Sequence, residues 1–147
     1  MARKWTRTEA FRFYNTEARN PYCSWSARSA DGNTVAVSLW KHEFKGPIGR
    51  MIYDRPGTAD WYDGAGKHHF FQDLAWAVAN CGGIVRVVLV VRDPCEPGRA
   101  LECYPQKNWL MRVTHLDPKA GAFRLEQAIP AEMAVRYPSS HAVALVA

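Results

Sequence analysis

Alternating apolar and polar residues predict a β-hairpin in the first third of the chain. Residues 34–40 alternate strictly and place three aliphatic side chains on one face, which is typical of a half-buried strand. Residues 23–27 alternate in the same way, and Asp31-Gly32 between the two runs favours a tight turn. We therefore expect the two runs to pair as antiparallel neighbours.

Two helices are predicted from their start and stop signals. Thr6 and Glu9 have the spacing of a capping box before an apolar run, which predicts a short helix over residues 7–15. Residues 68–81 gather apolar side chains on one helical face and end at Gly82-Gly83, a stop signal. One helix therefore precedes the hairpin and one follows it.

The rest of the pattern predicts strands. Residues 84–91 are apolar on both faces apart from Arg86, which is typical of a central strand. In the strand predicted over residues 108–116, we expect Met111 and Val113 to face the core and Leu110 to face outward. Further short strands are expected over residues 51–53, 100–104, 122–128 and 142–147.

This order of elements predicts one α+β domain over residues 1–147. Two helices and a succession of strands favour a mixed or mostly antiparallel sheet, flanked by the helices. Because so many strands must hide their edges, we expect a curved sheet or a small barrel. The chain has 48% hydrophobic and 22% charged residues, which excludes wholesale disorder.

Positive charge is concentrated at the start of the chain. The formal net charge is +5, and residues 1–28 carry six basic and two acidic side chains. Thirteen of the 19 basic residues are Arg, whose planar fork suits phosphates and base edges. A basic N-terminal region favours a nucleic-acid partner, DNA or RNA. The alternative is an ordinary soluble surface, or an Arg bias from a GC-rich genome.

No segment resembles a signal peptide or a membrane span, so we expect a cytoplasmic protein without a membrane partner. The four Cys form no C-x-x-C pair and are expected to be reduced thiols.

Aromatic residues supply a candidate binding surface. The glycine-rich stretch 41–67 carries Trp61 and Tyr62, and the hairpin carries Trp25 and Trp40. Bases stack on such rings, and three aromatic walls can enclose a flipped or modified base. The alternative is that the hairpin tryptophans fill the core, as we expect for Trp76 and Trp109. The predicted nucleic-acid-binding residues are Arg3, Arg7, Arg12, Arg28, Arg50, Trp25, Trp40, Trp61, Tyr62 and Asn20.

Enzyme motifs are weak by comparison. Asp93 follows one predicted strand and Glu102 lies in the next, an arrangement similar to that of metal nucleases. Those enzymes have a Lys two residues after the Glu, and this chain has Tyr104 there. His68 and His69 could add an acid–base group to such a site. Zinc deaminase spacing is absent, and neither a metal nor another cofactor is expected. A metal-dependent nuclease and a protein-interaction subunit, including a homodimer, remain the alternatives to a non-enzymatic binding module.

The layout also resembles a known group of domains. The hairpin Trp25-Ser26-Ala27…Leu39-Trp40, the buried strand ending at Asp93 and the later Trp109-Leu110-Met111-Arg112 are similar in order to PUA-like domains, including the EVE, ASCH and SRA branches. The similarity covers about 110 residues. It implies a compact β-barrel with flanking helices that binds RNA or modified DNA, in several members through an aromatic cage. The resemblance thus implies a reader of nucleic acid and not a catalyst.

Overall fold

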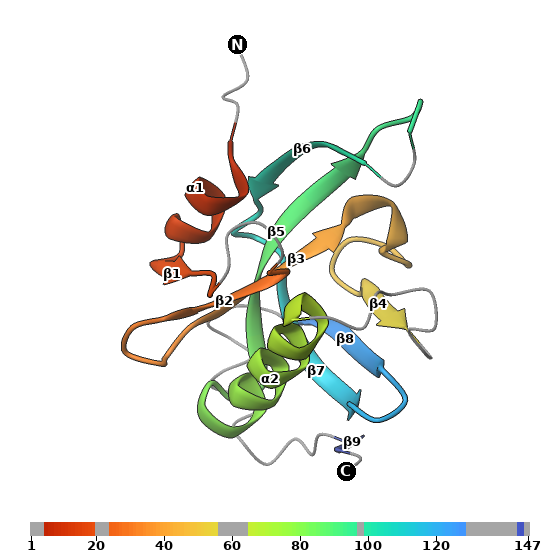
Figure 1. Ribbon diagram of the computed structural model, residues 1–147. Helices are drawn as coiled ribbons and strands as arrows, with labels where there is room; N and C mark the ends of the chain where they lie inside the picture. Colours follow the sequence, from red (N-terminus) through yellow and green to blue (C-terminus); the bar gives the residue numbers. More distant parts are fainter. Residues whose placement is uncertain (1–4, 20–23, 56–64, 97–98, 129–143, 146–147) are drawn as a thin grey trace.

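The computed structural model describes residues 5–19, 24–55, 65–96, 99–128 and 144–145, and it has an α+β fold (Figure 1). The helices are α1 (Arg7–Arg12), the short 3-10 helix η1 (Lys41–Glu43) and α2 (Ala65–Asn80). The strands are β1 (Thr16–Glu17), β2 (Ser26–Ser29), β3 (Val35–Trp40), β4 (Ile52–Arg55), β5 (Ile84–Arg92), β6 (Ala100–Pro105), β7 (Leu110–Asp117), β8 (Ala122–Ala128) and β9 (Ala144–Leu145). The predicted fold class is confirmed.

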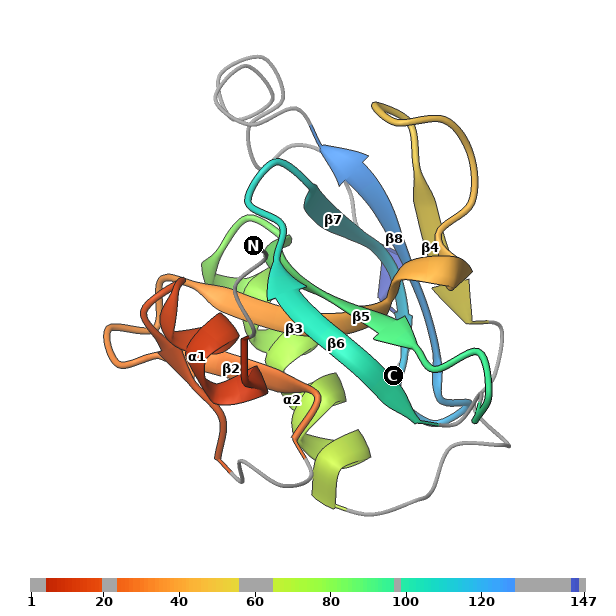
Figure 2. The ribbon, with the colours of Figure 1, turned by 90° about the horizontal axis from the view of Figure 1, so that it is seen from above.

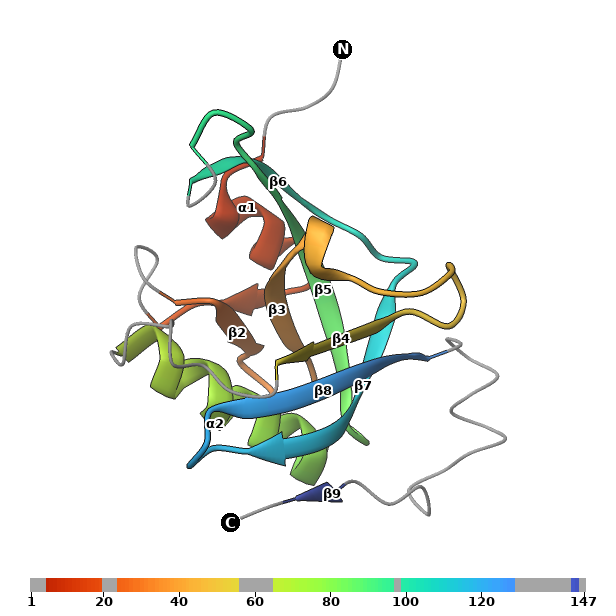
Figure 3. The same cartoon turned by 90° about the vertical axis from the view of Figure 1, so that its right-hand side faces the viewer.

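The described strands form one mixed, mostly antiparallel sheet. Their order is β1-β2-β3-β5-β7-β8-β4, with β6 also beside β5 and β9 beside β7. Only the β3–β5 and β7–β9 pairs are parallel within the described part of the chain. The order ends at β1 and β4 without closing, so the sheet is open and not a small barrel. Figure 2 and Figure 3 show β4 and β8 passing across β3 and β5.

Strand β5 is central, as its apolar run predicts. One of its edges pairs with β3, while β7 and then β6 share the other edge. Its buried aliphatic side chains therefore lie on both faces of the sheet, which explains why apolar and polar residues do not alternate along it.

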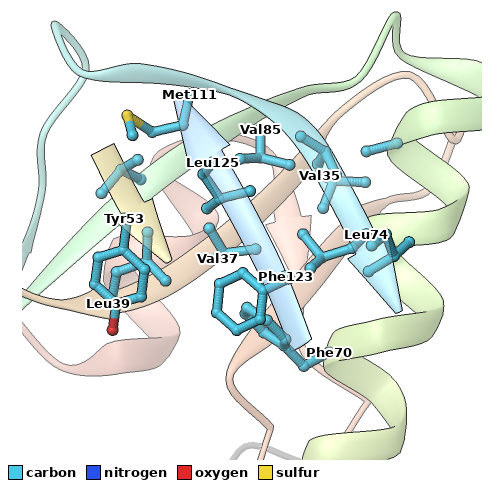
Figure 4. Close-up of a cluster of buried hydrophobic side chains, with 14 of the residues drawn as sticks. Val35, Val37, Leu39, Tyr53, Phe70, Leu74, Val85, Met111, Phe123 and Leu125 are labelled. Atoms are coloured by element: carbon cyan, nitrogen blue, oxygen red, sulfur yellow. The ribbon is translucent and has the colours of Figure 1, made fainter. Parts of the chain in front are cut away.

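The two halves of the sheet enclose the main core. Side chains from β3 and β5 meet those from β4, β7 and β8, and Phe70 and Leu74 of α2 fill the side of the cluster (Figure 4). Full burial of such side chains stabilises the fold by about 1.5–3 kcal/mol each. Trp76 and Trp109 also pack against this cluster, which confirms their predicted structural role.

Helix α1 covers the opposite face of the sheet. The Thr6 hydroxyl accepts from the Glu9 N–H (3.1 Å) and the Glu9 carboxylate accepts from the Thr6 N–H (2.9 Å), so the predicted capping box is confirmed. Ala10 and Phe11 are buried against Ala27 and neighbouring small residues of the sheet. The sheet is therefore covered on both faces near β2 and β3.

The predicted hairpin is confirmed as β2 and β3. Its turn places Gly32 at φ +75°, and a Cβ there would lie 2.9 Å from the Trp76 ring. The Gly32 carbonyl also accepts from Trp76 Nε1 (2.8 Å). Glycine is thus required at this turn both by the backbone and by the approach of α2.

The inward positions of Met111 and Val113 in β7 are confirmed, but the opposite face is less exposed than an outward position predicts. Leu110, expected to face outward, is 6% exposed, and its partner Ala128 in β8 is 3% exposed. This end of the β7–β8 pair is therefore covered on both faces. A register shift between Val113 and His115 then brings Leu116, not His115, into the core.

Candidate functional site

Two of the predicted stacking residues lie together at one end of the hairpin. The Trp25 carbonyl accepts from the Ser38 N–H (2.8 Å), so Trp25 lies opposite Ser38 on the neighbouring strand. Trp40 is two residues further along β3 and therefore shares this face. The centroids of the two indole rings are 5.8 Å apart and the ring planes are tilted by 46°. The exposed His42 ring continues the row, 5.6 Å from Trp40.

Arg7 of α1 lies at the other end of this row. Its guanidinium carbon is 4.9 Å from the centroid of the Trp25 ring, within cation–π range. Arg7 Nη1 also donates to the Ser24 carbonyl (3.4 Å). We call Arg7, Trp25, Trp40 and His42 the tryptophan row. Both tryptophans are half-buried, and Trp25 also packs against the main core.

A polar cluster behind β3 holds Trp40 and η1 in place. Tyr53 Oη donates to Glu43 Oε1 (2.6 Å) and accepts from the Trp40 N–H (3.4 Å). Arg55 forms an ion pair with Glu43 at 3.1 Å. Burial, with the adjacent Glu43 carboxylate, raises the pKa of Tyr53 above its ordinary value. The hydroxyl therefore stays a hydrogen-bond donor through the usual range of tyrosine titration.

A second polar cluster, which sequence reasoning missed, lies between β2 and α2. Asp73 is 1% exposed. Its carboxylate accepts from Ser26 Oγ (2.5 Å), Arg19 Nη2 (2.8 Å) and Arg28 Nη2 (3.0 Å). We call Asp73, Ser26, Arg19 and Arg28 the Asp73 cluster. Two arginines on one buried carboxylate satisfy its charge and tie α2 to the hairpin.

The sequence held one signal for this cluster. Asp73 lies three residues after Phe70 and next to Leu74, on the apolar face of the predicted helix. A carboxylate on a buried helix face requires a cationic or hydrogen-bonding partner. The identity of that partner depends on the contact of β2 with α2, which local pattern does not contain.

Ser24 and His69 form a third contact, beside the Asp73 cluster. Ser24 Oγ and His69 Nδ1 are 3.2 Å apart. A serine–histidine pair of this kind can form a nucleophile, but Ser24 has no exposed surface. Asp73, one turn along α2, is bonded to Ser26 and the two arginines, so it is not the carboxylate that orients His69. We read the contact as a structural link between the hairpin and α2.

The remaining predicted site residues are dispersed. Arg12 ends α1 and pairs with Glu17 at 3.4 Å. Arg28 belongs to the Asp73 cluster and also lies 4.2 Å from the centroid of the Trp76 ring. Arg50 is exposed in the loop between η1 and β4, and this loop lies on the far side of β3 from α1 (Figure 1). The predicted residues that lie outside the described ranges are Arg3, Asn20, Trp61 and Tyr62.

The residues weighed for an enzyme are separated. Asp93 follows β5, where its carboxylate accepts from the Cys95 N–H (2.8 Å), and Glu102 is exposed on β6. His68 and His69 lie on α2, away from the β5–β6 end (Figure 1). Within the described ranges, no three His, Cys, Asp or Glu side chains are grouped closely enough to hold a metal ion.

Burial raises the pKa of the two half-buried thiols, Cys81 and Cys103, which keeps them in the less reactive protonated form.

Comparison with protein-family models, curated proteins and solved structures gives no match. No helix in the described part of the chain is long and apolar enough to span a bilayer.

Proposed function

We propose that the protein is a cytoplasmic nucleic-acid-binding module in which an unpaired base stacks on the tryptophan row. The observation that carries this proposal is the continuous order Arg7, Trp25, Trp40, His42 at one end of the hairpin. It combines a cation with three aromatic rings, which is the combination that single-strand binders use.

The geometry favours stacking on one outer face over insertion between rings. The planes of Trp25 and Trp40 are tilted by 46°, and their centroids are only 5.8 Å apart. That leaves no parallel slot for a base between them. A base can instead lie against the solvent side of Trp40 and His42, whose centroids are 5.6 Å apart and whose planes are tilted by 54°. Stacking of this kind contributes about 1–3 kcal/mol per base.

The distribution of positive charge also favours nucleic-acid binding near the tryptophan row. Arg7 and Arg12 both lie on α1, at the basic N-terminal end of the chain. Phosphate contacts from such residues make affinity fall with salt, because each contact releases counterions from the nucleic acid. Arg19 and Arg28 contribute less, since Asp73 neutralises part of their charge.

The test uses a fluorescent oligothymidine, a duplex and an oligonucleotide with a modified base, each titrated by anisotropy at several salt concentrations. Trp40→Leu keeps an apolar side chain without a ring, and we expect it to lower single-strand affinity about tenfold, within the range for one stacked base. Trp40→Phe keeps a ring and should retain most of the affinity.

A matched control is Trp109→Leu, which removes a ring that contacts the core and Phe44 rather than the row. It should reduce stability without changing affinity at temperatures where the variant is folded. Absence of binding to all three probes at low salt would remove the proposal, and so would an affinity that does not depend on salt.

A further inference from the structure

A pocket of about 500 Å³ lies where α1, β1 and β2 meet. In Figure 1 these elements are the red and orange ones on the left, beside the β2–β3 turn. Its lining residues carry two guanidinium groups and one carboxylate on a surface that is otherwise largely apolar: Arg12, Asn15, Thr16, Glu17, Arg28 and Ala30.

The chain builds this pocket by a reversal and a strand register. Asn15 takes the left-handed conformation, φ 60°, which turns the chain from α1 into β1. In the β1–β2 pair, Glu17 then lies opposite Arg28. Arg12, at the end of α1, reaches Glu17 at 3.4 Å. Arg12 of α1 and Arg28 of β2 thus both line this pocket.

Several hydrogen-bond donors at this pocket are uncommitted. Arg12 contacts Glu17 through Nε, and Arg28 contacts Asp73 through Nε and Nη2. Among the described residues, Nη1 and Nη2 of Arg12, Nη1 of Arg28 and the Asn15 side-chain amide have no hydrogen-bond partner. The Asp73 carboxylate and the Trp76 ring fix the Arg28 side chain. Binding at Arg28 therefore costs little side-chain ordering.

These donors favour an anion of phosphate type. The planar guanidinium fork matches two phosphate oxygens, and an amide can donate to a third. Three guanidinium groups (Arg12, Arg19 and Arg28) face two carboxylates (Glu17 and Asp73) across the pocket and the adjoining cluster, which leaves an excess of positive charge. Glu17 competes with a bound anion for Arg12 and so limits its affinity.

We propose that this pocket binds a phosphate group of the same nucleic-acid strand whose base stacks on the tryptophan row. The proposal rests on the proposed function. Trp25 directly precedes β2 and lies three residues from Arg28, about 10 Å along an extended strand, and this odd spacing places the two side chains on opposite faces of the sheet. Arg7 and Arg12 lie five residues apart along α1, about 7.5 Å. The row and the pocket are therefore connected by α1 and the β2 segment, and a single strand that contacts both passes around the edge of the sheet beside β2.

The test compares two exposed arginine–glutamate pairs of similar geometry. Arg12–Glu17 has 64% and 73% side-chain exposure, and Arg99–Glu96 has 68% and 64%. Oligothymidine affinity is measured by anisotropy for Arg12→Gln, Glu17→Gln, Arg99→Gln and Glu96→Gln.

We expect Arg12→Gln to lower affinity several-fold and to make the salt dependence shallower by about one phosphate contact. Glu17→Gln should raise affinity several-fold, because it frees Arg12 and removes a competing carboxylate. The variants at Arg99 and Glu96 should change affinity by less than twofold. A purely structural role for the Arg12–Glu17 pair would not give opposite signs for its two partners.

If the variants of both pairs change oligothymidine affinity equally while Trp40→Leu still lowers it, the phosphate site in the pocket is wrong. The proposed function would then still stand. A second arm titrates inorganic phosphate against the ¹⁵N-labelled protein and follows the Arg12 and Arg28 side-chain signals by NMR. Saturable shifts of these signals, together with absence of oligonucleotide binding, would overturn both the strand assignment and the proposed function. The pocket would then be a site for a free phosphate compound.

Discussion

Two arginine–tryptophan contacts in this molecule have different surroundings. They are Arg7 with Trp25 and Arg28 with Trp76. The guanidinium carbon lies 4.9 Å from the ring centroid in the first pair and 4.2 Å in the second. In the second pair the arginine is bonded to buried Asp73, and the indole N–H is bonded to the Gly32 carbonyl. In the first pair the ring continues into Trp40 and His42 at the surface.

The difference lies in what else each pair contacts. Hydrogen bonds to Asp73 and to the Gly32 carbonyl commit the Arg28–Trp76 pair to holding α2 against the hairpin. In the Arg7–Trp25 pair, Arg7 also donates to the Ser24 carbonyl, and the Trp25 ring lies at the edge of the core beside Trp40. A cation–π contact therefore does not indicate function by itself, and the partners around it decide whether it is structural or open to a ligand.

Removal of the buried carboxylate is the strongest test of this comparison. Asp73→Asn leaves Arg19 and Arg28 without their counter-charge, and we expect the free energy of unfolding to fall by about 3 kcal/mol. This is the lower end of the range for a broken buried pair, because both arginines keep some contact with water. Urea denaturation measures the loss. Glu96→Gln, in an exposed pair, should change stability by less than about 1 kcal/mol.

Replacing each arginine by Gln distinguishes the structural Arg28–Trp76 contact from the Arg7–Trp25 contact at the surface. Arg28→Gln should cost about 2 kcal/mol of stability, since it removes charged hydrogen bonds to Asp73. Arg7→Gln should cost about 1 kcal/mol, since it removes the cation–π contact with Trp25 and a long hydrogen bond to the Ser24 carbonyl, and it should weaken oligonucleotide binding. Denaturation and anisotropy on both variants give the result. If Arg7→Gln proves the more destabilising of the two, the proposed distinction between the pairs is wrong.

The smallest expected effect is on stability at high pH. Burial raises the pKa of Tyr14 from 10.0 to about 12, and its hydroxyl donates to the Val87 carbonyl (2.8 Å). Between these values the folded protein keeps a proton that the unfolded chain releases, so this contribution to stability is complete below pH 10 and is lost as pH rises toward 12. The pKa of Tyr53 is raised in the same direction.

Two tyrosine variants relate this effect to the tryptophan row. Tyr14→Phe and Tyr53→Phe should each make the fall in stability above pH 10 shallower, as measured by urea denaturation across that range. Tyr53→Phe should also reduce oligonucleotide affinity at neutral pH, because Tyr53 supports Trp40 and Glu43. Equal affinity for the two variants would show that the support behind Trp40 does not affect the surface.

Local sequence patterns predicted the elements well, since their causes are local. The capping box at Thr6 and Glu9 forms as expected, and the Asp31-Gly32 turn joins the strands on either side of it. The outer face and the end of β7 were predicted less well. Its register shift after Val113 and the burial of Leu110 both depend on strands that arrive later in the chain.

For the candidate site, the sequence identified the chemistry and the structure assigned the positions. Trp25, Trp40 and Arg7 were selected by residue type, and the register of the β2–β3 pair places the two tryptophans on one face. The addition of Arg7 requires α1 to pack across the sheet. Arg28 was selected for the same reasons as Arg7, yet its main partner lies 45 residues away on α2.

The sequence by itself determined the α+β class, the two helices, the hairpin and the concentration of basic residues before residue 29, because each depends on spacing within about a dozen residues. Only the tertiary structure decided that β3 and β5 pair in parallel, that the sheet stays open, and which arginine faces Asp73 and which faces the surface. These outcomes depend on long-range packing, in which a buried charge must find a partner wherever the chain supplies one.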